Sequence, residues 1–303
     1  MSASALPSAS SATSRPTVLG VIGGSGLYDM PGLQDVREHR IDTPFGAPSD
    51  ALIEGRIGTT QMFFLPRHGR GHRFSPSEIN YRANIWALKS VGVTDIISVS
   101  AVGSMRESIH PGDLVIIDQF IDRTLGRPRT FFSDGVVAHV PFGDPVSKRV
   151  STALIAACKK VDVNHHIGGA YVCIEGPQFS TRAESLTFRT WSDVAVIGMT
   201  NLPEARLARE AEIPYATLAL ATDYDCWHSD HDAVTVDQVV AVMKSNVVNA
   251  QRVIRAVAEQ PPVGADPAEE ALKFAVMTHP DAIPAAARER LALFLDKYLP
   301  PRA

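Results

Sequence analysis

Arginine and histidine stand close together after one of the apolar segments of the sequence. The run Pro66-Arg67-His68-Gly69-Arg70-Gly71-His72 directly follows a segment that ends at Leu65. An arginine guanidinium offers several donors in a rigid fork, which suits a small anion such as phosphate. His68 and His72 are four residues apart and could hold a metal on a helix, but the glycines disfavour a helix and no carboxylate accompanies them. We therefore predict an anion site, and no metal site, at this loop.

Two further turns with small and polar residues follow apolar segments. The first, Gly23 to Gly26, lacks the third glycine of the dinucleotide fingerprint and the Gly-Lys-Ser/Thr of a Walker A loop. Its backbone N–H groups and the Ser25 hydroxyl can approach an anion, although a plain tight turn would have the same composition. The second, Ser100 to Ser104, adds hydroxyl and amide donors. The sequence alone leaves both interpretations of the glycine turn open.

Carboxylates and large side chains mark the ends of other strands. Asp223 and Asp225 are two residues apart, and alternate side chains of an extended segment point the same way. They could face the donor groups of one ligand, or be two solvated turn aspartates. Phe179 and Met199 follow two other strands, and Met199 could equally be a core residue.

Short apolar strands alternate with amphipathic helices along the chain. This alternation predicts an α/β fold with a mixed or mostly parallel sheet covered on both faces. In such sheets ligands bind outside the carboxyl ends of the strands, where the residues above stand. The predicted strands are Val18–Ile22, Ala51–Ile53, Met62–Leu65, Asp95–Ser100, Leu114–Ile117, Ala170–Ile174, Val194–Ile197 and Tyr215–Ala221, and the predicted helices are Glu78–Val91, Thr181–Trp191, Pro203–Glu212, Val236–Ala258, Pro267–Met277 and Ala285–Leu299.

Composition excludes several classes of function. The formal net charge is −4, which argues against general nucleic-acid binding, and the longest apolar runs are too short to span a bilayer. Three scattered cysteines fit a reducing compartment, so we expect a cytoplasmic protein without disulfides. Residues 1–16 are rich in Ser and Ala and are predicted to be a disordered tail without a secretory signal. Residues 17–258 form the predicted domain, and 259–303 a linker with C-terminal helices.

Seven ordered motifs together resemble one known family. The chain resembles the S-methyl-5′-thioadenosine phosphorylases, a branch of the trimeric purine nucleoside phosphorylase family, over Val18 to about Ala258. The resemblance implies a single α/β domain around a mixed, partly barrel-like sheet flanked by helices. It also implies phosphorolysis of S-methyl-5′-thioadenosine to adenine and 5-methylthioribose 1-phosphate, in purine and methionine salvage, with inorganic phosphate as co-substrate and no cofactor. The motifs are IGGSGLYD, DTPFGAPSDALIEG, RHGRGH, INYRANIWALK, PGDLVIIDQFIDRT, IEGPQFSTRAES and ATDYDCW.

The resemblance further implies a role for each matching residue. The implied catalytic set is Asp223, which would assist protonation of the purine N7, with Arg67 and His68 at the phosphate. Sites shared between the subunits of a homotrimer are implied as well. The phosphate positions are Ser25, Arg67, His68, Ser100, Ala101 and Thr200; the nucleoside positions are Met199 under the ribose, Asp223 and Asp225 at the purine, Phe179 near the base, Val236, Val239 and Val240 at the 5′ group, and His139 and Met277 reaching a neighbouring subunit's site.

Three other functions compete with this one. A phosphorylase for 6-oxopurine nucleosides, such as inosine, guanosine or methylthioinosine, is the nearest, and such relatives favour Asn where this chain has Asp223. A hydrolytic nucleosidase would not need Arg67 and His68 around a second, anionic substrate. A nucleoside sensor without turnover would need no phosphate positions at all. The dependence of cleavage on phosphate therefore separates a phosphorylase from a nucleosidase, and release of free adenine from methylthioadenosine, with and without phosphate, settles most of the remaining choice.

Overall fold

The computed structural model describes residues 16–27, 29–228 and 236–299, without the side chains of Ser25 and residues 236–240. The predicted N-terminal tail therefore lies outside the described residues except for Pro16. The described strands form one 11-stranded mixed sheet. They are β1 (Val18–Gly23), β2 (Gln34–His39), β3 (Leu52–Ile57), β4 (Thr60–Pro66), β5 (Asp95–Ser104), β6 (Leu114–Ile116), β7 (Gln119–Arg123), β8 (His165–Ile167), β9 (Ala170–Ile174), β10 (Val194–Gly198) and β11 (Tyr215–Asp223).

The sheet divides at β5, its longest central strand. One continuous path runs in the order β2-β3-β4-β1-β5-β10-β9-β7, while β11, β6 and β8 branch off from β5. Strands β1 and β11 pair with β5 in parallel, whereas the end of β5 pairs antiparallel with β10 through Gly103 and Ser104. The predicted mixed sheet is thus confirmed, and β5 takes part in both arms of the branched sheet.

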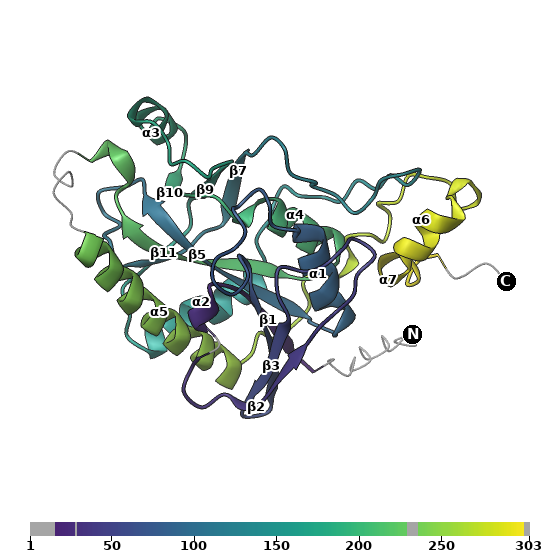
Figure 1. Cartoon of the computed structure of the whole chain (residues 1–303), viewed down its shortest axis with the longest axis horizontal. Coiled ribbons are helices and arrows are strands. Elements are labelled where there is room, and N and C mark those ends of the chain that lie inside the picture. The colour runs from purple at the N-terminus through teal and green to yellow at the C-terminus, as the bar shows by residue number, and fades with distance from the viewer. Residues whose placement is uncertain (1–15, 28, 229–235, 300–303) are drawn as a thin grey trace, which may run out of the picture.

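Helices cover the sheet on both sides. They are α1 (Tyr81–Ser90), α2 (Lys148–Lys160), α3 (Arg182–Arg189), α4 (Asn201–Glu210), α5 (Val236–Glu259), α6 (Ala285–Arg290) and α7 (Ala292–Leu295). Helices α2 and α5 pack on each other and on β11, and α4 packs on β11 and on α1. Figure 1 shows these two pairs on opposite flanks of the central strands. Residues 215–221 of β11 are consequently all buried, as the continuous apolar run predicts.

The structure differs from the sequence prediction at several exposed or irregular segments. Strand β2 is mostly exposed and was not predicted, because it lacks the apolar pattern of a covered strand. Strands β7 and β8 and helix α2 were not predicted either. The helix predicted over Pro267–Met277 is wrong: only a 3-10 turn, Pro267–Glu270, forms there. The chain then pairs with another segment through Ala138 and Val276 instead of continuing a helix.

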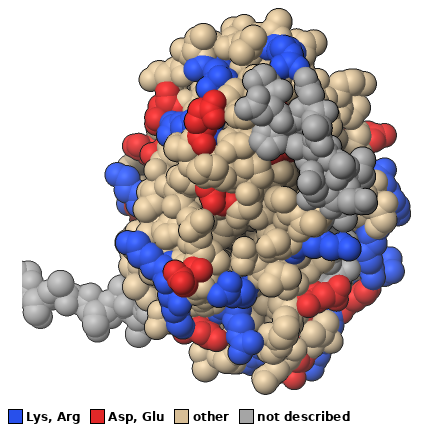
Figure 2. All heavy atoms as spheres, turned by 90° about the vertical axis from the view of Figure 1, so that its left-hand side faces the viewer, with Lys and Arg blue, Asp and Glu red and all other residues tan. Residues whose placement is uncertain are grey.

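The C-terminal segment shares the main core. Leu272, Leu291 and Leu295 belong to the same buried apolar cluster as the sheet, and the Phe294 ring centroid lies 4.5 Å from that of Phe131. Positive and negative side chains are interspersed over the face shown in Figure 2. The three cysteines are free thiols. Among the described residues, no helix is long and apolar enough to cross a membrane.

Candidate active site

A cavity of about 800 Å³ lies where the predicted site residues gather. It opens at the carboxyl ends of β1, β4, β9, β10 and β11 and along the second half of β5. Nine of the predicted residues line it: Arg67, His68, Ser100, Ala101, Phe179, Met199, Thr200, Asp223 and Asp225. Gly24 also lines it, but the side chains of Ser25, Val236, Val239 and Val240 lie outside the described part of the chain.

Most N–H groups of Arg67 already donate hydrogen bonds to other groups of the protein. Its Nε and Nη2 donate to the Glu204 carboxylate at 2.7 and 2.9 Å, and Nη1 donates to the Val99 carbonyl at 3.1 Å. Nη2 also donates to Ser98 Oγ at 2.6 Å. Since a guanidinium has five N–H groups, one hydrogen on Nη1 is left without a partner among the described residues. Arg67 can therefore offer a ligand one hydrogen bond, not the two-pronged contact that its type suggests.

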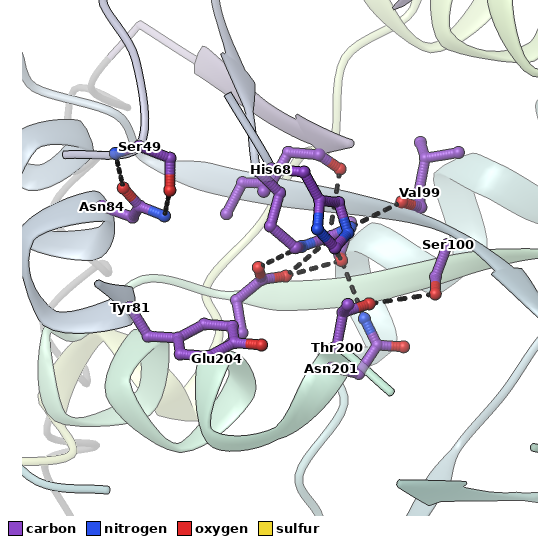
Figure 3. Close-up of polar contacts among 12 residues, drawn as sticks. Ser49, His68, Tyr81, Asn84, Val99, Ser100, Thr200, Asn201 and Glu204 are labelled. Carbon is purple, nitrogen blue, oxygen red and sulfur yellow. Dashed lines mark hydrogen bonds and ion pairs between the residues drawn. The ribbon is translucent and has the colours of Figure 1, made fainter. Parts of the chain in front are cut away.

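The charge of Arg67 is balanced by a buried carboxylate. Arg67 and Glu204 are both almost fully buried. Burial alone would lower the pKa of Arg67, but the neighbouring Glu204 more than offsets this and the pKa is raised. Ser98 and Tyr215 donate further hydrogen bonds to Glu204, at 2.7 and 2.9 Å. Figure 3 shows Glu204 reaching from α4 toward the centre of this network. The Arg67–Glu204 pair therefore adds little net charge to the anion end of the cavity.

His68 stands beside Arg67 with one ring nitrogen already engaged. Its Nδ1 lies 2.8 Å from the carbonyl oxygen of Phe74. Its ring stacks on that of His72, with the centroids 4.2 Å apart and the planes at 16°. Burial lowers the pKa of His68 to about 4, so the imidazole is neutral at pH 7.

Hydroxyl groups complete the anion end. Ser100 Oγ lies 3.2 Å from Thr200 Oγ1 (Figure 3). It also lies 3.1 Å from the Tyr171 hydroxyl. Burial raises the pKa of Tyr171 to about 12, so this phenol remains a donor. Gly198 makes room for it, because a Cβ there would lie 2.0 Å from the Tyr171 oxygen. These hydroxyls can rotate to donate to an anion or to accept from it.

The two aspartates lie together at the other end of the cavity, for a reason that the sequence prediction missed. Asp225 does not extend the strand but has a φ of 52° at the start of a 3-10 turn, Asp225–Trp227. Its backbone N–H donates to Asp223 Oδ1 at 2.8 Å, and Thr222 donates to Oδ2 at 2.7 Å. The Ser185 hydroxyl donates to Asp225. The turn, not strand alternation, places both carboxylates at the cavity.

The two carboxylates differ in their burial. Burial raises the pKa of Asp225, against the hydrogen bond from Ser185, which lowers it. Asp223 is the more exposed of the two. Gly103 of β5 lies beneath them, since a Cβ there would lie 3.1 Å from Asp223 Oδ1 and from Asp225 Cβ. Because Gly103 has no side chain, a flat ligand can approach the carboxylate end of the cavity directly over the backbone of β5.

Met199 lies between the two ends, held by a loop contact and by a buried arginine. Gly176 has a φ of 67°, and a Cβ there would lie 2.5 Å from Met199 Sδ. Arg127 donates to the carbonyls of Met199 and Glu175, both at 2.6 Å, and to that of Leu202 at 2.8 Å. One side chain thus ties together the loops after β9 and β10. Phe179, in the first of these loops, is 83% exposed at the cavity.

Sequence reasoning missed the residues that support the site. Glu204 could have been noticed, because it is a carboxylate on an otherwise apolar helix face next to Ala205 and Ala208. Arg127 lies in an irregular segment, and no local pattern marks it. Asn201 is also buried and donates to the hydroxyls of Ser98 and Tyr215, both at 2.9 Å.

His139 and Met277 do not line this cavity. They lie near each other instead, in two short segments joined by the bridge between Ala138 and Val276. His139 N–H donates to the Ala275 carbonyl at 2.9 Å, and both His139 and Met277 are exposed. Their role at a neighbouring subunit's site stays a prediction. Within the described part of the chain, no three His, Cys, Asp or Glu side chains gather as metal ligands would.

Several known proteins are similar to this chain in sequence. The model of the phosphorylase superfamily matches residues 18–259. The S-methyl-5′-thioadenosine phosphorylase of Geobacter sulfurreducens is 57% identical over 284 residues, which are 93% of this chain and 99% of its own. That of Koribacter versatilis is 55% identical over 281 residues, 92% of this chain and 96% of its own.

Solved structures agree with the sequence relatives. A methylthioadenosine phosphorylase from an Antarctic soil metagenomic library has a TM-score of 0.88 and 48% identity, covering 92% of this chain and 99% of its own. The methylthioadenosine phosphorylase of Schistosoma mansoni in complex with adenine has a TM-score of 0.75 and 38% identity, covering 80% and 91%. The chain therefore belongs to the phosphorylase superfamily and, within it, to the family of the S-methyl-5′-thioadenosine phosphorylases.

Proposed function

We propose that this protein cleaves S-methyl-5′-thioadenosine with inorganic phosphate, giving adenine and 5-methylthioribose 1-phosphate, as a cytoplasmic enzyme of purine and methionine salvage. One observation carries the proposal: a single cavity joins an anion end, built by Arg67, His68 and Ser100, to a carboxylate end, built by Asp223 and Asp225. The first suits phosphate and the second suits the donors of a 6-aminopurine.

The reaction follows from this arrangement. An oxygen of hydrogen phosphate attacks C1′, the bond from C1′ to the purine nitrogen breaks, and the purine keeps the electron pair. The proton that the phosphate gives up balances the one that the purine gains. Holding both substrates in one cavity makes the attack effectively unimolecular. Ser100 and Thr200 contact the phosphate, while Met199 packs under the ribose. Asp223 is placed to accept a hydrogen bond from an N7–H.

The site is completed by a second chain in this proposal. Phe274, Met277 and Val137 are 89%, 64% and 48% exposed, and Phe179 at the cavity is 83% exposed. Exposed apolar groups of this size are typical of surfaces that meet a partner. We propose a homotrimer in which His139 and Met277 of one subunit close the cavity of the next, and in which Val236, Val239 and Val240 pack on the 5′-methylthio group.

Product analysis tests the proposal. The protein is incubated with S-methyl-5′-thioadenosine in phosphate and in phosphate-free buffer, and free adenine and the sugar phosphate are measured. We expect adenine and the sugar phosphate with phosphate, adenine and the free sugar with arsenate, whose sugar ester hydrolyses, and neither product without one of these anions. Equal adenine release without phosphate would identify a nucleosidase, preference for inosine a 6-oxopurine enzyme, and binding without turnover a sensor. Sizing of the active protein tests the trimer, which an active monomer would refute.

A further inference from the structure

The hydrogen bond between His68 and Phe74 fixes where the imidazole proton resides. A backbone carbonyl oxygen can only accept, and it lies 2.8 Å from Nδ1 of His68. Nδ1 must therefore carry the hydrogen. In the neutral ring the other nitrogen, Nε2, is then a bare lone pair, because a neutral imidazole has one N–H only.

The bare nitrogen is available to a ligand. His68 lines the cavity, and its Nε2 makes no hydrogen bond to any described residue. The surroundings oppose a second proton on the ring: burial lowers the pKa of the half-buried His68 most, and Arg67 and His72 lower it further, whereas the hydrogen bond to Phe74 and, least, Glu204 act in the opposite direction. The positive charge of Arg67 is itself balanced by Glu204. His68 therefore meets an incoming anion as an acceptor, not as a donor.

We propose that His68 makes the anion end selective for an oxyanion that brings a proton, because Nε2 accepts a hydrogen bond from that proton. The inference rests on the proposed function and assigns a protonation state to its co-substrate. Phosphate and arsenate carry a proton on one oxygen at neutral pH, whereas sulfate carries none. A sulfate oxygen would face the Nε2 lone pair without a hydrogen between them. The site thus distinguishes anions of nearly the same size and shape.

The assay compares anions on the wild-type protein at fixed ionic strength and pH 7.5. Phosphate and arsenate are measured as co-substrates, and sulfate as a competitor of phosphate. A hydrogen bond to a charged group is worth about 10- to 150-fold in affinity, so sulfate should bind at least about 10-fold more weakly than phosphate.

Three variants assign the selectivity to Nε2. In His68→Asn the amide N–H can still reach the Phe74 carbonyl, but nothing occupies the place of Nε2. The preference for phosphate over sulfate should fall at least about 10-fold, through weaker phosphate binding. In His68→Gln the side-chain amide can rotate to donate an N–H hydrogen bond to the anion, so sulfate binding should improve. His72→Asn is the matched control, since it removes the stacked ring but leaves Nε2, and it should keep the preference.

Two results would overturn the inference. One is wild-type sulfate binding as tight as phosphate binding, and the other is an unchanged preference for phosphate over sulfate in His68→Asn. The first does not depend on whether a variant folds. If adenine release needs no phosphate, the proposed function itself fails. If release needs phosphate but sulfate competes equally, only the role of His68 fails.

Discussion

Replacing Glu204 with glutamine should destabilise the fold before it changes the chemistry. Glu204→Gln leaves the Arg67 charge buried and without a counter-charge, although the new amide oxygen can still accept from Ser98 or Tyr215. Removing one partner of a buried ion pair typically costs about 3–5 kcal/mol. With about 2.1 cal/mol/K of unfolding entropy per residue, this lowers the Tm of a chain of this size by about 5–8 °C.

The assay is thermal unfolding of matched variants. Arg67→Met combined with Glu204→Gln removes both charges, so most of the lost stability should return, while phosphate binding stays weak. The control is Arg70→Gln in the same loop: the Arg70 side chain is 42% exposed and pairs with Glu38 and Asp50, and surface ion pairs contribute about 0–1 kcal/mol each. A Tm drop for Glu204→Gln no larger than that of Arg70→Gln would refute the reasoning, as would a double variant less stable than Glu204→Gln alone.

Other residues give further expectations. Arg127→Met should lower kcat/KM for the nucleoside about 10-fold or more, with a smaller effect on the phosphate KM, because it frees the carbonyls of two cavity loops; equal effects on both substrates would contradict this. Asp223→Asn should reduce the preference for S-methyl-5′-thioadenosine over its inosine analogue by about 10²-fold in kcat/KM. Val236→His should cut the preference for methylthioadenosine over adenosine by about 1–3 kcal/mol, and an unchanged ratio would remove Val236 from the 5′ site. Burial raises the pKa of Glu210 from 4.5 to about 7, so its favourable contribution is complete below pH 4.5 and is lost as the pH rises through 7. The free energy of unfolding of Glu210→Gln should therefore rise relative to wild type between pH 5 and pH 8, by up to about 3 kcal/mol, and a constant difference would contradict the shift.

The sequence predicted the covered strands and the cavity residues because both leave a local signal. A strand such as β11, buried on both faces, is a continuous apolar run, and the polar groups that follow such strands meet at one edge of the sheet. Exposed β2 carries no such pattern and was missed. As an arginine after a buried strand, Arg67 could be predicted to lie at the site. Its partner Glu204 could not be predicted, since it is 137 residues away in the chain. Contacts over that separation depend on the fold, which no local spacing records.

The role of β5 has a consequence for how substrate preference can change. Ser100 lies at the anion end and Gly103 lies beneath the two aspartates, three residues further along one strand. Three residues of strand span about 10 Å, a separation fixed by backbone geometry. Neighbours of β5 in both arms of the sheet hold this spacing rigid. Mutations in the turn at Asp225 can therefore alter the accepted base during evolution, while the distance between nucleophile and leaving group is inherited unchanged.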